Sequence, residues 1–300
     1  INMNIKDLNV VFVGCARDCG DTLLKSLENI KIYSSFFNLT YQVIVENGSK
    51  DKTREILKKN KNQNNYYLFE DHLNELPYRG QRLEKARNAI IQKIKSNSDL
   101  SKCDILIVLD LDGSGNYLIN EKDILDAIKF LYSKESIGAV FANQLGTYYD
   151  MWTLRDDIYC KNDYWAEVLK IITKKILPKE KITNEIISEV KKDYIDKNIL
   201  SFDKNSPPIK VKSAFGGFGI YKMNYVLKNK RYYQGTQIVD LTFKDNTQAK
   251  IKFQKCEHVN FNFGFLDQNL ELYILPSLIN REYLEVTFPP QAALNLIIKR

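Results

Sequence analysis

The sequence predicts an α/β domain built on a mainly parallel, doubly wound sheet, and three observations support this. Apolar runs of strand length alternate with helical stretches through the first 112 of the 300 residues. Such βαβ alternation needs crossover connections, which make the strands parallel and place helices on both faces of the sheet. Several runs also end abruptly in polar residues, at the edge where open α/β sheets bind ligands.

The individual elements follow from these patterns, with a break in regularity near the middle of the chain. In the first part we expect strands at residues 8–13, 41–45, 66–69 and 105–109, and helices at residues 21–37, 51–59 and 81–94. The second part predicts a helix at 123–132, a strand at 137–142, Lys/Glu-rich helices within 161–200, and short β segments at 210–211, 218–221, 238–243 and 249–253.

Charge and cysteine usage limit the classes of partner and compartment. The formal charge of +7 and pI of about 8.9 favour anionic partners such as nucleotides, phosphorylated substrates or an anionic membrane surface, although a solvated lysine-rich surface explains them equally well. The five scattered cysteines lack zinc-site spacing and fit free thiols in a reducing compartment. No apolar run reaches transmembrane length and no signal peptide is recognisable, so we expect a cytoplasmic protein, with peripheral membrane contact as an alternative.

Asp110 and Asp112 stand at the carboxyl end of the apolar run 105–109. Side chains two residues apart on a strand point to the same face, so the two carboxylates can converge on one hard divalent cation. Mn²⁺ or Mg²⁺ held in this way can in turn hold a diphosphate. The pair therefore predicts a metal and diphosphate site.

The same segment also fits the ligand positions of a calcium-binding EF-hand loop. Asp110, Asp112, Ser114, Gly115 and Glu121 occupy positions 1, 3, 5, 6 and 12 of such a loop. An EF-hand needs a helix on each side, whereas the preceding residues have strand character. A structural turn without metal is a third interpretation.

The ends of the first two strands supply further candidates for nucleotide contacts. The loop after residue 14 is not a P-loop, because residues 21–22 are Asp-Thr where Lys-Ser/Thr is required, and it is not G-x-G-x-x-G. An NTPase or dinucleotide dehydrogenase is therefore disfavoured. Arg87, on the helix before the Asp pair, can stabilise a diphosphate. The candidates from the strand ends are Cys15, Ala16, Arg17, Glu46, Asn47 and Asp51, the last of which is equally well explained as a helix cap.

Three later segments carry the remaining candidates. Gly216 and Gly217 lie in a glycine turn that lets a sugar approach the backbone, or simply form a bend. Glu257 is the candidate base and His258 a candidate third metal ligand, unless the histidine is structural. In the earliest of the three segments, Trp152 can stack on a sugar or equally fill the core, and Arg155 can bind phosphate or a sugar hydroxyl. Asp156 and Asp157 can contact an acceptor, and Asp156 is the second catalytic candidate if Glu257 lies away from the Asp pair.

These motifs, in this order, resemble nucleotide-diphospho-sugar transferases of the GT-A fold. The shared features are Glu-Asn-Gly-Ser-x-Asp at 46–51, Ala-Arg-Asn at 86–88 and Asp-Leu-Asp at 110–112. Residues 149–156, followed by Val-Lys-Ser and glycines at 211–217, are similar to a stretch of the fungal capsule-type α-mannosyltransferase family. The resemblance implies that Asp110, Leu111 and Asp112 form the Asp-x-Asp metal and diphosphate motif. His258 stands where that fold usually has Asp.

The resulting expectation is a metal-dependent glycosyltransferase that moves a hexose from a UDP- or GDP-linked sugar to a glycan, protein or lipid-linked acceptor, without binding nucleic acid. Glu257 is the leading base if the reaction inverts the anomeric centre, whereas the mannosyltransferase resemblance implies retention. The alternatives are a sugar-1-phosphate nucleotidyltransferase and a non-catalytic basic module that binds phosphate or nucleic acid. We expect one GT-A domain over 1–300, with a nucleotide-binding half at 1–115 and a smaller mixed acceptor and metal half at 116–300 that includes a helical insertion at about 161–205.

Overall fold

The protein is built around one eight-stranded sheet. A computed structural model describes residues 4–283, except for the side chains of residues 114, 115, 282 and 283. The strand order is β3-β2-β1-β4-β7-β5-β10-β6, and all strands except β7 and β6 run in the same direction. The strands are β1 (Asn9–Ala16), β2 (Leu39–Glu46), β3 (Asn65–Phe69), β4 (Ile105–Leu109), β5 (Ile137–Gly146), β6 (Ile209–Val211), β7 (Phe218–Lys222) and β10 (Glu271–Tyr283). The predicted α/β class with a mainly parallel sheet is confirmed.

Each face of the sheet has its own apolar core, as a doubly wound arrangement requires. Along β1, Val10 and Phe12 join one core while Val11 and Val13 join the other. The first core is covered by α1 (Leu23–Ser34), α2 (Thr53–Lys59) and α5 (Glu121–Ser133). The second is covered by α3 (Arg79–Ser96), the short α4 (Ser98–Ser101), α8 (Met223–Lys228) and α9 (His258–Leu266).

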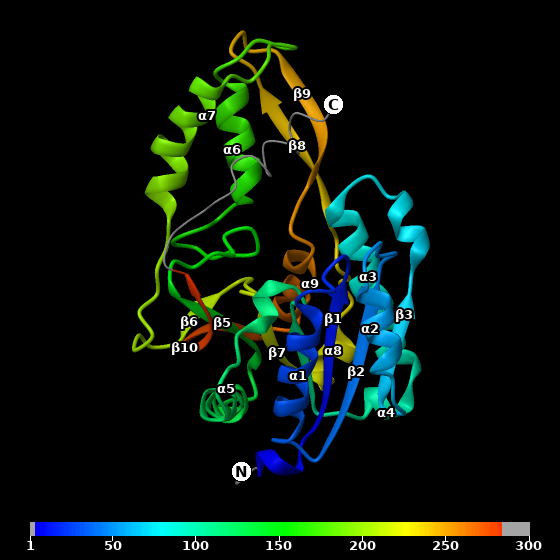
Figure 1. Ribbon diagram of the computed structural model, residues 1–300. Helices are drawn as coiled ribbons and strands as arrows, with labels where there is room; N and C mark the ends of the chain where they lie inside the picture. The colour runs from blue at the N-terminus through cyan, green and yellow to red at the C-terminus, as the bar shows by residue number, and fades with distance from the viewer. Residues whose placement is uncertain (1–3, 284–300) are drawn as a thin grey trace.

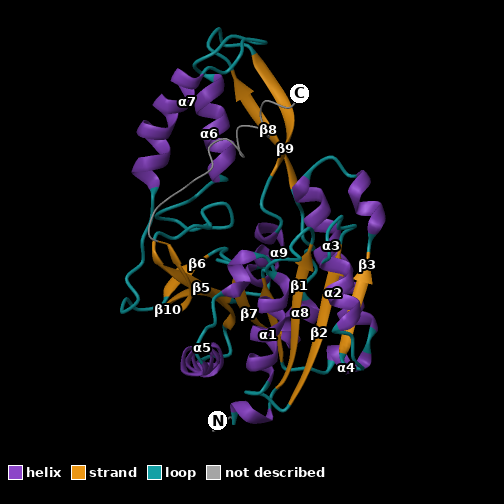
Figure 2. Ribbon diagram, viewed as in Figure 1, coloured by secondary structure: helices purple, strands orange, loops and turns teal. Residues whose placement is uncertain are grey.

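A smaller lobe projects beyond the carboxyl ends of the parallel strands (Figures 1 and 2). It consists of α6 (Tyr164–Thr173), α7 (Asn184–Val190) and a hairpin of β8 (Thr236–Thr242) and β9 (Gln248–Gln254). Ala166 and Leu169 of α6 pack against Val239, Leu241 and Phe253 of the hairpin in a separate small core. The predicted helical region at 161–200 and both hairpin strands are therefore present.

The hairpin is tied at its root to the start of α3. The backbone of Gly235 and that of Gly80 touch so closely that a Cβ on either glycine would lie 2.0–2.5 Å from the carbonyl oxygen of the other. Gln254 Oε1 accepts a hydrogen bond from the Gly80 N–H at 3.0 Å. Among the described helices, none is both long and apolar enough to span a bilayer.

Candidate active site

Asp110 lies where the carboxyl end of β4 meets the amino end of β7. Its N–H donates to the Gly217 carbonyl oxygen at 3.1 Å, which extends the β4–β7 pairing by one step. Gly216 and Gly217 have φ values of +64° and +81°, in the left-handed region that glycine tolerates best. A Cβ on Gly217 would lie 2.8 Å from Tyr149 Oη and 3.4 Å from Asp110 Oδ2. The predicted glycine turn and the predicted metal ligand are therefore in direct contact.

Side-chain burial alternates along the Asp-Leu-Asp segment, as expected at the end of a strand. Leu111 is buried, and its side chain packs beside Gly14 while its carbonyl oxygen accepts from Ser26 Oγ. Asp112 is exposed and Asp110 is partly buried. Burial and the neighbouring Asp112 raise the pKa of Asp110 to about 7, and Arg87 acts in the opposite direction. Two such carboxylates suit a hard cation that completes its coordination with water and phosphate oxygens.

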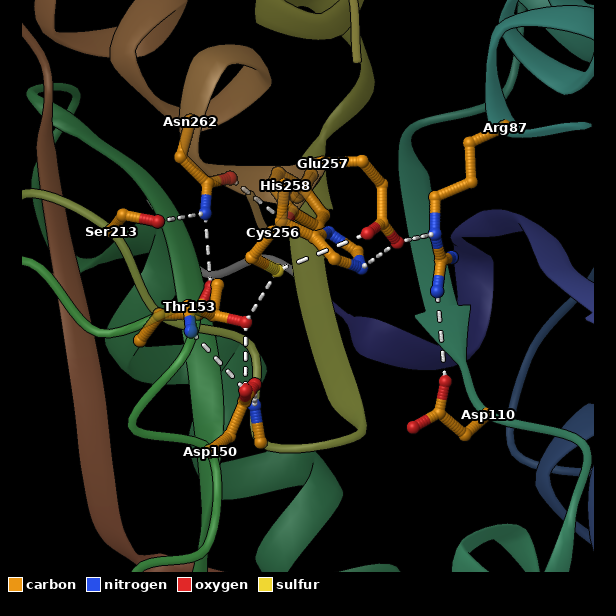
Figure 3. Close-up of polar contacts among 12 residues, drawn as sticks. Arg87, Asp110, Asp150, Thr153, Ser213, Cys256, Glu257, His258 and Asn262 are labelled. Atoms are coloured by element: carbon orange, nitrogen blue, oxygen red, sulfur yellow. Dashed lines mark hydrogen bonds and ion pairs between the residues drawn. The ribbon is translucent and has the colours of Figure 1, made fainter. Parts of the chain in front are cut away.

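Arg87 connects Asp110 to Glu257 (Figure 3). Its Nε donates to Glu257 Oε1 at 2.8 Å, and its Nη2 lies 3.6 Å from Asp110 Oδ1. The guanidinium carbon lies 5.3 Å from the centre of the Phe215 ring and 5.9 Å from that of Tyr233. The side chain is 6% exposed, so this cation is held inside the protein beside a candidate metal ligand.

Glu257 and His258 lie at the start of α9, where the backbone turns into a helix instead of continuing as a strand. His258 is buried and its ring stacks on Phe215 with the centroids 4.0 Å apart. Burial, with Arg87, moves the pKa of His258 well below 6.5, so the ring is neutral. Within residues 4–283, His, Cys, Asp and Glu side chains form no group of three or more that could hold a metal ion, so the role of His258 as a third ligand stays a prediction.

Arg79 adds positive charge near Asp110, and its neighbour Arg82 is also close to Arg17. Arg79 is exposed and contributes positive charge at both Asp110 and Cys15. Arg82 is half-buried, and burial together with Arg17 and Arg79 lowers its pKa. Mutual repulsion of this kind is relieved by an anion. Arg79 was not among the residues that we expected in the site.

The remaining candidates lie in the loops after β1 and β2, and hydrogen bonds join these two loops. Burial raises the pKa of the Cys15 thiol to about 11, and Ala16 is buried. Glu46 is fully buried and its carboxylate pairs with Arg54 at 2.5 Å. The Asp51 carboxylate accepts from the N–H groups of Gly20 and Thr53, which ties the loop after β1 to the start of α2. The buried Asn47 Oδ1 has no hydrogen-bond partner among the described residues.

The segment after β5 divides into residues at the site and residues that hold the loop together. Arg155 forms a buried ion pair with Asp163 at 2.6 Å, so its charge is neutralised within the loop. Asp156 Oδ1 accepts the N–H groups of three residues, Ile158, Tyr159 and Cys160. Trp152 is half-buried, and its buried indole nitrogen has no hydrogen-bond partner among the described residues.

Tyr149 and Asn280 also reach the site; the sequence marked Tyr149 only as the first residue of the 149–156 stretch and did not mark Asn280 at all. Tyr149 Oη donates to Asp110 Oδ2 at 3.5 Å. Asn280 Nδ2 donates to the Gly216 carbonyl oxygen at 2.6 Å, and Gln144 Nε2 donates to that same oxygen at 3.1 Å. The ends of β5 and β10 therefore position the glycine turn through buried amides, a role that leaves no recognisable motif.

The raised carboxylate pKa values predict a pH dependence of stability in protein freed of metal by EDTA. Burial raises the pKa of Asp150 to about 6, and that of Asp110 is about 7. The folded state therefore holds protons more tightly than the unfolded state, so the free energy of unfolding falls as pH rises from about 4 to 7. For Asp110 the upper limit is about 4 kcal/mol, because one pKa unit is about 1.4 kcal/mol.

Urea unfolding at several pH values between 4.5 and 8 measures this slope. We expect Asp110→Asn to flatten it, so that the variant is more stable than the wild-type protein near pH 8 and similar near pH 4. Identical slopes in the two proteins would contradict the assignment of a raised pKa to Asp110.

Comparison with known proteins gives structural similarity only. No protein-family model matches the sequence, and no curated protein matches it. The mannosyltransferase PcManGT from Pyrobaculum calidifontis, solved with GDP-Man and Mn²⁺, aligns over 95% of this chain and 59% of its own, with 11% identity and a TM-score of 0.48.

Two other solved structures align in the same way. The alignment with S. aureus TarS (residues 1–349) covers 91% of this chain and 59% of the TarS chain, with 13% identity and a TM-score of 0.44. Glucosyl-3-phosphoglycerate synthase from Mycobacterium tuberculosis, in complex with UDP, covers 97% and 78%, with 11% identity and a TM-score of 0.43. The chain thus spans about three-fifths of the length of the first two.

Proposed function

We propose that this protein is a metal-dependent glycosyltransferase that moves a hexose from a UDP- or GDP-linked sugar to an acceptor hydroxyl. The observation that carries the proposal is the position of two neighbouring carboxylates at the end of β4, one of which, Asp110, lies 3.6 Å from the buried cation of Arg87. One side of that site offers oxygen ligands and the other offers fixed positive charge, which together match a metal-bound diphosphate.

Asp110 and Asp112 are the residues that would hold Mn²⁺ or Mg²⁺. When bound, the cation would offset the charge that develops on the departing diphosphate. Arg87 lies at the site, and its buried Nη1 has no hydrogen-bond partner among the described residues. Arg79 adds positive charge at Asp110, and Arg82 lies close to both Arg79 and Arg17. These arginines support the binding of the anionic part of the donor.

The glycine turn and the loop after β5 would form the acceptor side. Gly216 and Gly217 place buried backbone beside Asp110. Tyr149, which contacts Asp110, comes from the 149–156 stretch that resembles the fungal capsule-type mannosyltransferases. We propose Trp152 as an acceptor contact in this loop, with Asp156 shaping the loop around it through the three N–H groups that it accepts. The acceptor would be a glycan, protein or lipid-linked hydroxyl.

A donor-hydrolysis screen tests the proposal most directly. The protein is incubated with UDP- and GDP-linked hexoses and Mn²⁺, and release of UDP or GDP is measured with a matched EDTA control. We expect slow release from one class of donor that stops in EDTA. A nucleotidyltransferase would instead release pyrophosphate from a nucleoside triphosphate and a sugar-1-phosphate. Pyrophosphate release without donor hydrolysis would overturn the proposal.

A further inference from the structure

Glu257 lies in a position that a general base does not usually occupy. Its side chain is 3% exposed, and Oε1 accepts a charged hydrogen bond from Arg87 Nε at 2.8 Å. Its other oxygen, Oε2, lies 3.9 Å from the sulfur of the buried Cys256. A base must come within hydrogen-bond reach of the proton that it removes, and a carboxylate already engaged by a guanidinium is a weak proton acceptor.

Arg87, by contrast, is fixed in place with part of its hydrogen-bonding capacity unused. The Phe215 and Tyr233 rings flank it, Glu257 holds Nε, and Nη2 lies 3.6 Å from Asp110 Oδ1. The buried Nη1 has no hydrogen-bond partner among the described residues. A buried cationic donor without a partner is costly, so the arrangement favours an anionic ligand at this point.

We infer that Glu257 is a positioning residue that acts through Arg87. It holds the guanidinium by Nε so that Nη1 and Nη2 face a phosphate oxygen of the donor beside Asp110. The inference rests on the proposed function and deepens it, because it makes Glu257 the residue that holds Arg87 in place for the donor diphosphate. In this role Glu257 takes no proton from the acceptor.

The two roles of Glu257 give opposite results in a binding experiment. Loss of a base leaves donor affinity unchanged and lowers turnover, whereas loss of a positioning charge weakens the binding of the diphosphate. Isothermal titration of UDP and GDP with Mn²⁺ measures the dissociation constant for the wild-type protein and for Glu257→Gln, Glu257→Asp and Arg87→Lys. Hydrolysis of the accepted donor gives kcat and KM for the same proteins.

We expect Glu257→Gln and Arg87→Lys to weaken diphosphate binding by at least about tenfold. The first removes the charge that holds the guanidinium, and the second replaces the forked guanidinium donors by a single ammonium group. Glu257→Asp, which restores the charge, should recover most of the affinity. The double variant Glu257→Gln/Arg87→Lys should bind no more weakly than Arg87→Lys alone, because both changes act on the same contact.

The chain contains a matched control in the buried ion pair of Arg155 and Asp163, which is 2.6 Å long and 5–6% exposed. Asp163→Asn should lower stability, measured by urea unfolding, without changing nucleotide affinity. Glu257→Gln with wild-type affinity and lost turnover would overturn the inference in favour of a base. Equal loss of affinity in Asp163→Asn would also overturn it. Absence of nucleotide binding by the wild-type protein would instead overturn the proposed function itself.

Discussion

Asp110→Asn and Asp112→Asn are expected to abolish Mn²⁺-dependent binding of UDP or GDP, with a loss of at least about 100-fold in affinity. Mg²⁺ and Mn²⁺ at such sites are held through one or two carboxylates and substrate phosphates, and a neutral amide replaces a charged ligand poorly. The two residues lie on either side of the buried Leu111, so each change removes one of the paired carboxylates without disturbing the core. Titration calorimetry with Mn²⁺ and with EDTA measures the effect.

Asp104→Asn is the matched control for this experiment. Asp104 precedes the same strand at its opposite end, where its carboxylate accepts a hydrogen bond from the Asn9 N–H at 2.8 Å. An asparagine can accept the same bond, so we expect wild-type affinity. Metal-dependent binding that survives in Asp110→Asn or Asp112→Asn would remove the basis of the proposed metal site.

The second large effect is expected from Gly217→Ala. The left-handed backbone at φ +81° strains any residue with a Cβ, and the added carbon would lie 2.8 Å from Tyr149 Oη, 3.2 Å from Asn280 Nδ2 and 3.4 Å from Asp110 Oδ2. We expect a loss of about 1–3 kcal/mol in the free energy of unfolding. We also expect turnover to fall by at least about tenfold, because a displacement of Tyr149 or Asp110 changes the geometry of the site.

Gly113→Ala separates this effect from the general cost of adding a methyl group. A Cβ on Gly113 would meet no heavy atom within 4 Å, and its backbone is not in the left-handed region. Urea unfolding and donor hydrolysis of both variants give the comparison. Wild-type stability in Gly217→Ala would show that the turn accommodates a side chain and that the crowding around Asp110 is relieved at little cost.

The first half of the fold could be predicted because its local signals agree with its tertiary structure. The run at 105–109 is apolar, of strand length and bounded by polar residues, and it forms β4 over the same residues. The presence of a strand here, instead of a helix, removes the structural basis for the EF-hand interpretation. The same agreement between local pattern and packing holds for the strands and helices up to α3.

Strand β10 could not be predicted because it contains a proline, which the sequence rules read as evidence against a strand. Pro276 lies within β10, and proline normally argues against a strand interior. The structure accommodates it with a shift in register between Ile274 and Ile279, and its carbonyl oxygen accepts from Asn143. α9 was missed for a different reason: it is apolar on nearly all faces, so it lacks the amphipathic period that identifies a helix.

In the site, too, the residues close together in the sequence could be predicted, whereas contacts between distant residues could not. Asp110 and Asp112 carry a recognisable spacing within one strand end. The contacts of Arg87 with Glu257, and of Asn280 with Gly216, join residues 170 and 64 positions apart. Only the fold brings such pairs together, and a single sequence contains no local pattern for them.

The insertion of β7 beside β4 has a consequence for cutting the chain into fragments. β7 comes from residues 218–222, yet it pairs along the whole length of β4. A fragment that ends at residue 115 would leave the backbone edge of an Ile-, Leu- and Val-rich strand uncovered, and such edges associate with other chains. The two halves of the sequence are thus expected to be insoluble when expressed separately. Co-expressed, they should recover a folded heterodimer, in which the second fragment supplies the strand that the first one lacks.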